Sequence, residues 1–87
     1  MTADRTTQQL CRANLIKERQ VEAAVSTYLA DTSTRQFDLA DGYRLNLAAA
    51  VRANRFAARA LMDRRSSESV RRMIVRTAIL LARPVKG

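Results

Sequence analysis

The chain of 87 residues carries 16 Lys and Arg residues against eight Asp and Glu residues and no His, which gives a formal net charge of +8. A hydrophobic content of 47% with only two Gly and one Pro is too apolar for a disordered chain, and the length suffices for one domain with a modest core. One Cys and no His exclude an intramolecular disulfide, a structural zinc site and histidine-based acid–base catalysis. We therefore expect a single basic helical domain over residues 1–87, with no metal, cofactor or catalytic site.

The expected compartment is intracellular and cytoplasmic. Residues 1–9 are polar and do not have the basic start and apolar stretch of a signal peptide. The longest apolar run, residues 77–82, is far shorter than the ~20 residues that a membrane-spanning helix needs. The lone Cys11 has no His to activate its thiol, so we expect it to be buried and unreactive.

The first long helix is predicted to begin near Thr6, because Thr6 and Gln9 have the spacing of a capping box. Its apolar residues fall on one side of a continuous helix, apart from Ile16, which lies off that side. The polar residues 31–34 compete for backbone hydrogen bonds and end the helix. The members of the apolar side are Leu10, Val21, Val25 and Tyr28.

The segment of residues 35–47 supports two interpretations. As a β-hairpin, it has a three-residue loop at 40–42 that places Gly42 in a left-handed position. As a helix, it continues an apolar ridge at four-residue steps, at a cost of about 1 kcal/mol for the interior glycine. The hairpin register pairs Leu39 with Tyr43, Phe37 with Leu45, and Asp38 with Arg44.

Two further helices are predicted, which makes a mainly α, three-helix domain. The second long helix runs from residue 46 or 47 to about 64, since it is rich in Ala and free of Gly and Pro. The last helix is capped by Ser66 or Ser67, carries Glu68 in its first turn, and ends before Pro84. Its expected inner face consists of Val70, Met73, Ile74, Thr77, Leu80 and Leu81.

The positive charge is concentrated in the second half of the sequence. Residues 1–43 hold five basic residues against six acidic ones, whereas residues 44–87 hold eleven against two. A segment with this excess of positive charge attracts polyanions, and the planar guanidinium group of arginine can donate two parallel hydrogen bonds to a phosphate. Two rows of arginines on the second and last helices are the candidate nucleic-acid-binding residues: Arg44, Arg52, Arg55 and Arg59, and Arg65, Arg72, Arg76 and Arg83.

A second apolar strip on the second helix suggests a protein partner. Either this helix is central in the bundle, or a second copy or a larger protein complex covers the strip. The aromatic ring of Phe56 is the expected anchor. The candidate interface residues are Leu45, Ala49, Ala53, Phe56 and Ala60.

These features give two hypotheses from different classes. The first is a non-enzymatic nucleic-acid-binding protein or accessory subunit that contacts the DNA or RNA backbone with little base readout. The alternative is a small helical adaptor or inhibitor that docks on an acidic surface of a larger assembly. Binding to an anionic membrane ranks below both, because the last helix lacks Trp and Phe and the core needs its apolar face.

Overall fold

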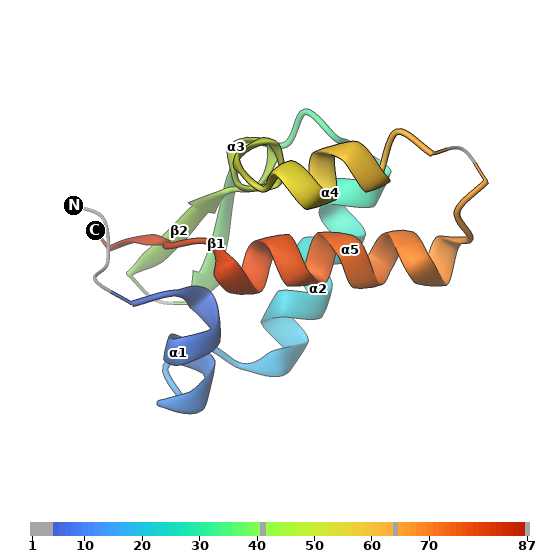
Figure 1. The fold of residues 1–87 in the computed structure, drawn as a ribbon. Coiled ribbons are helices and arrows are strands. Elements are labelled where there is room, and N and C mark those ends of the chain that lie inside the picture. Colours follow the sequence, from blue (N-terminus) through green and yellow to red (C-terminus); the bar gives the residue numbers. More distant parts are fainter. Residues whose placement is uncertain (1–4, 41, 64, 87) are drawn as a thin grey trace.

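The computed structural model describes residues 5–40, 42–63 and 65–86 (Figure 1). The mainly helical architecture with a small hairpin is confirmed, but the expected count of three helices is wrong, because two of the expected helices are each broken once. The described elements are α1 (Thr7–Arg12), α2 (Glu18–Ala30), β1 (Gln36–Ala40), β2 (Tyr43–Asn46), α3 (Leu47–Ala53), α4 (Arg55–Ala60), α5 (Glu68–Leu81) and β3 (Val85–Lys86).

The first break separates α1 from α2. The capping box forms as expected, since the Gln9 amide donates to Thr6 Oγ1 at 3.3 Å and the Thr6 amide donates to Gln9 Oε1 at 2.8 Å. Asn14 then adopts a left-handed backbone with φ of 62°, which Asn tolerates better than most residues with a side chain. The break turns Ile16 inward to an exposure of only 1%, which explains its poor fit to one continuous helix.

The second break lies at Asn54, so the prediction of one helix from residue 47 to about 64 is wrong. Asn54 has an extended backbone, and its side-chain Oδ1 accepts a hydrogen bond from the Ala57 amide at 3.0 Å. Asn54 thus ends α3 and caps α4, because its side chain competes successfully for a backbone donor. Arg64 lies outside the described residues.

The hairpin interpretation of residues 35–47 is confirmed, and the helical alternative is wrong. The pairs Phe37–Leu45 and Asp38–Arg44 form as expected, but Tyr43 pairs with Ala40 instead of Leu39, because the register shifts between residues 38 and 40. Gly42 has the expected positive φ, at 82°, whereas Asp41 lies outside the described residues. The two-residue strand β3, which pairs with β2, is too short to leave a sequence pattern.

Helix α5 is the centre of the fold: it contacts α1, α2, α3 and α4 (Figure 1). Ser67 caps it as expected, through a 3.3 Å hydrogen bond from the Val70 amide to the serine hydroxyl. Its α1 contact is fixed by Thr7, whose amide and hydroxyl both donate to the Ala82 carbonyl, at 2.8 and 3.1 Å. None of the helices in the described part of the chain is long and apolar enough to cross a membrane.

The expected inner face of α5 is largely wrong. Of its six members, Ile74 is buried and Leu80 is half-buried, whereas the other four are exposed. Apolar residues cover more of the circumference of α5 than its neighbouring helices can bury. The side that these helices bury differs from the side that the sequence pattern predicted. The buried residues are Ile74, Val75, Ala78 and Ile79; the exposed members of the expected face are Val70, Met73, Thr77 and Leu81.

Candidate docking surface

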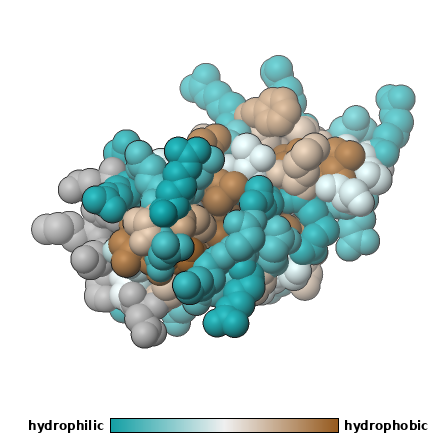
Figure 2. Space-filling model, turned by 90° about the horizontal axis from the view of Figure 1, so that it is seen from below, coloured by the Kyte–Doolittle hydropathy of each residue, from teal (hydrophilic) through white to brown (hydrophobic). Residues whose placement is uncertain are grey.

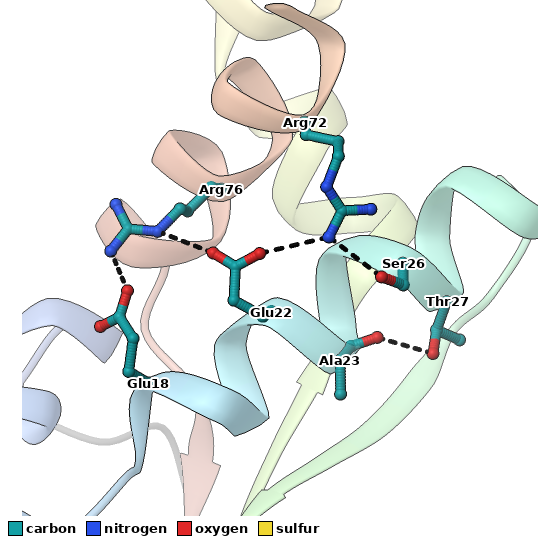
Figure 3. A network of polar contacts seen from close by, with 7 residues as sticks. All are labelled: Glu18, Glu22, Ala23, Ser26, Thr27, Arg72 and Arg76. Carbon is teal, nitrogen blue, oxygen red and sulfur yellow. Dashed lines mark hydrogen bonds and ion pairs between the residues drawn. The ribbon is translucent and has the colours of Figure 1, made fainter. Parts of the chain in front are cut away.

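Two of the predicted phosphate-binding arginines are engaged by carboxylates of α2 (Figure 3). Arg72 Nη2 donates to Glu22 Oε2 at 3.2 Å and to Ser26 Oγ at 3.0 Å. Arg76 Nε lies 3.2 Å from Glu22 Oε1, and its Nη2 donates to Glu18 Oε1. Glu22 therefore contacts both arginines and Arg76 contacts both acids, so the four side chains form one network in which the charges are partly neutralised.

This ion-pair network also contributes to the pKa shifts of Arg76 and Cys11. The hydrogen bond to Glu18 raises the pKa of Arg76 above its ordinary value. Burial, aided by the negative charge of Glu18, raises the pKa of the Cys11 thiol, and the positive charge of Arg76 partly opposes this effect. Cys11 is half-buried rather than fully buried, and its raised pKa agrees with an unreactive thiol.

Five of the eight predicted arginines are exposed and form no ion pair with another described residue. They are not one row. The break at Asn54 places Arg52 on α3, apart from the pair on α4, and two others lie outside the helices. Arg65 is also exposed but lies 4.0 Å from Asp63. The five exposed, unpaired arginines are Arg44, Arg52, Arg55, Arg59 and Arg83.

The arginine rows do not flank one groove. Arg72 and Arg76 project from α5 toward α2, as their contacts with its carboxylates show (Figure 3). Arg55 and Arg59 instead lie on α4, a different neighbour of α5. Arg44 lies directly opposite Asp38 in the hairpin, so its charge has an acidic neighbour.

A hollow of about 370 Å³ lies between α4 and α5, and we call it the α4–α5 hollow. Phe56 has 72% of its surface exposed and Met73 has 61%, which is unusual for side chains of this size. Arg55 and Arg59 are one residue before and three residues after the Phe56 ring on α4. The apolar residues lining the hollow are Phe56, Ala60, Val70, Met73 and Ile74, and its polar lining residues are Asp63, Ser66 and Thr77.

A second hollow, of about 410 Å³, lies where α3, β2 and the end of α5 meet, and we call it the α3–α5 hollow. It divides the predicted apolar strip, because Leu45, Ala49 and Ala53 line this hollow, whereas Phe56 and Ala60 line the other one. Leu45 is itself buried on β2 and belongs to the core. The strip residues are joined here by Leu81, Arg83 and Val85.

The two hollows lie along successive turns of α5, one beside residues 70–77 and the other beside residues 78–82, and we call their combined lining the docking face. Figure 2 views the molecule from below Figure 1 and shows that apolar side chains also reach the surface there, between hydrophilic ones. Val70, Met73 and Leu81 belong to the docking face but were assigned to the core by sequence. The signal that identifies them is the width of the apolar sector of α5, which exceeds what one buried stripe requires.

The described residues include no group of three or more Cys, Asp or Glu side chains arranged to hold a metal ion. Comparisons with protein-family models, with curated proteins and with solved structures found no match.

Proposed function

We propose that this chain is a non-enzymatic adaptor that docks on an acidic region of a larger protein through the docking face. One observation carries the proposal: the large apolar side chains Phe56 and Met73 are mostly exposed, and the arginines near Phe56 in the sequence of α4, Arg55 and Arg59, form no ion pair with a described residue. Contiguous exposed apolar surface in a small soluble protein is typical of an interaction site. Aromatic residues, Met and Arg are the residue types enriched in such interfaces.

The energetics favour a role in binding over a role in folding. The core already takes Ile74, Val75 and Ile79 from α5, so the fold does not require the ring of Phe56. Burying such a ring against a partner contributes about 1.5–3 kcal/mol. An arginine beside the ring adds charge-assisted hydrogen bonds to a partner carboxylate.

Site-specific photo-crosslinking tests this proposal. A benzophenone amino acid is placed at position 56 in cells that make the protein, and at position 15 as a control, since Leu15 is also exposed, at 47%, but is not among the lining residues of either hollow. We expect a discrete adduct from position 56 only. The captured protein is then purified, and its affinity for the Phe56→Ala and Leu15→Ala variants is measured. Equal crosslinking at both positions, or equal affinity of both variants, contradicts the docking face.

Binding to a nucleic-acid backbone is the second candidate function, and the five exposed, unpaired arginines favour it. The pairing of Arg72 and Arg76 with α2 carboxylates reduces the number of phosphate contacts that the charge of the chain alone suggests. With four or five phosphates neutralised, affinity for DNA or RNA falls roughly 10²–10³-fold between 50 and 200 mM salt. Fluorescence anisotropy with labelled single- and double-stranded DNA and RNA measures this slope. An absence of binding at 50 mM contradicts the nucleic-acid candidate.

A further inference from the structure

We propose that the segment which fills the docking face is an acidic amphipathic α-helix of another protein, lying along α5. This inference rests on the proposed docking function and specifies the occupant. Three features of the docking face carry it: its length, the helical secondary structure of most of its lining, and the charge around it.

The exposed ridge of α5 has the length and spacing of a helical binding site. It runs from Val70 through Thr77 to Leu81, which are seven and then four residues apart on one side of the helix. At a rise of 1.5 Å per residue the ridge spans about 16 Å, or three helical turns. A partner helix of three to four turns therefore reaches both hollows with apolar side chains spaced at i, i+3, i+4, i+7 and i+11.

The two hollows provide the places for the anchoring side chains. Their volumes of about 370 and 410 Å³ are at the low end of the range for pockets that bind small molecules. Each accommodates a large aliphatic or aromatic side chain of the partner. Met73 lines one hollow with a flexible thioether that adapts its shape to the inserted group.

The secondary structure of the docking face selects a helix over an extended peptide. An extended segment binds by adding a strand to an open sheet edge, where its backbone groups find partners. The ridge and most of the lining belong to α3, α4 and α5, whose backbone hydrogen bonds are internal. The edge strand β3 lines the α3–α5 hollow through Val85, but it is only two residues long and offers little edge for strand addition. A helix satisfies its own backbone and needs only side-chain contacts, which is what this surface offers.

The charge around the docking face selects an acidic partner over a second copy of the chain. Arg83 lines the α3–α5 hollow, and Arg55 and Arg59 lie near Phe56 in the sequence of α4, all three without a described ionic partner. The acidic residue that lines the α4–α5 hollow, Asp63, lies 4.0 Å from Arg65. Self-association is disfavoured by electrostatic repulsion, because it places two chains of net charge +8 against each other and brings these arginines close together. Acidic residues on both flanks of the apolar stripe of a partner helix pair with them instead.

Synthetic peptides test the inference with the intact protein. The first is an 18-residue labelled helix with Leu at the i, i+3, i+4 and i+7 positions and Glu on its flanks. The second has the same composition in an order that breaks the apolar stripe, and the third has Lys in place of Glu. We expect the first to bind at least tenfold more tightly than the second and the third not to bind, by fluorescence anisotropy at 100 mM salt.

Variants assign the binding to the docking face. Phe56→Ala should weaken the first peptide at least tenfold, and the Arg55→Gln, Arg59→Gln double variant should weaken it and reduce its salt dependence. Leu15→Ala should leave the affinity unchanged. Circular dichroism with the same peptides should show a gain of helix on binding.

Equal affinity for the first two peptides overturns the inference, because it shows attraction by charge alone. Insensitivity to Phe56→Ala overturns it as well, and so does sedimentation of the protein alone as a dimer that Phe56→Ala dissociates. A position-56 crosslink to a non-helical or basic partner segment overturns the helical, acidic occupant while leaving the docking function intact. Loss of that crosslink itself contradicts the docking function.

Discussion

The side chain of Asn54 shows how one polar residue changes the arrangement of a whole surface. Its hydrogen bond from the Ala57 amide ends one helix and begins the next. We predict that Asn54→Ala lowers the free energy of unfolding by about 1 kcal/mol, because a capping acceptor is lost. Urea denaturation measures this, with Ser69→Ala, which replaces an exposed serine of α5, as the control. A gain in stability together with a gain in helical signal would indicate that α3 and α4 join instead.

The high exposure of the Phe56 side chain predicts that Phe56→Ala has little effect on the stability of the fold. Because the ring is 72% exposed, the free energy of unfolding should change by no more than about 0.5 kcal/mol. The matched core truncation Leu39→Ala should cost about 2–5 kcal/mol, since Leu39 is fully buried. Both values come from the same urea titration. A large loss of stability in the Phe56 variant would mean that the ring stabilises the core, which would contradict its role as an exposed binding residue.

The thiol of Cys11 gives a pH-dependent prediction. Burial and Glu18 raise its pKa in the folded state, so the folded protein holds the thiol proton more tightly than the unfolded chain does. The stability of the fold should therefore fall as the pH rises above the ordinary pKa of a thiol. The rate of reaction with Ellman's reagent, followed against pH in native and urea-unfolded protein, should titrate at a higher pH in the native state. A native titration at the same or lower pH would contradict this.

At the scale of the elements, the contacts between α2 and α5 reduce the positive charge that is available to a partner. Two arginines of α5 are paired with carboxylates of α2, so the surface carries less unpaired positive charge than the sequence suggests. The side chains of Glu22, Arg72 and Arg76 are 44%, 35% and 39% exposed, so solvent screens their ion pairs. We predict that Glu22→Gln costs less than about 1 kcal/mol of stability, and that the difference disappears in 1 M salt. The control is the same substitution in an Arg72→Gln, Arg76→Gln background, where Glu22 has lost both of its ionic partners and Glu22→Gln should show no salt-dependent effect. An undiminished effect of Glu22→Gln at 1 M salt would contradict screening.

Local chemistry made several elements predictable from sequence. The Thr6 and Ser67 caps, the left-handed Gly42 and two hairpin pairs depend on neighbouring residues alone, and all of them are confirmed. The helix breaks were not predicted, because an Asn in an apolar sequence is compatible with a core hydrogen bond as well as with a cap. The buried side of α5 was not predicted either, since it depends on where α2 and α4 pack.

At the scale of the whole molecule, the division between a near-neutral and a basic half of the sequence is not a division of the structure into two surfaces. Acids of the first half, Glu18 and Glu22, neutralise basic residues of the second half across the α2–α5 contact. Of the predicted phosphate-binding arginines, those left exposed and unpaired lie on α3, α4, β2 and the segment after α5, and Arg83 among them lines the α3–α5 hollow. The docking face is therefore a tertiary feature, and sequence reasoning identified Phe56 but not its neighbours on α5.

The most direct test is a titration of the labelled acidic helical peptide and of labelled duplex DNA with the wild-type protein and the Phe56→Ala variant, side by side at 50 and 200 mM salt. If the apolar docking face selects the partner, Phe56→Ala weakens peptide binding at least tenfold at both salt concentrations and leaves any DNA binding unchanged. If Phe56→Ala binds the peptide as tightly as the wild type, and both ligands lose affinity with the same steep salt dependence, the arginines act alone and the central claim is wrong.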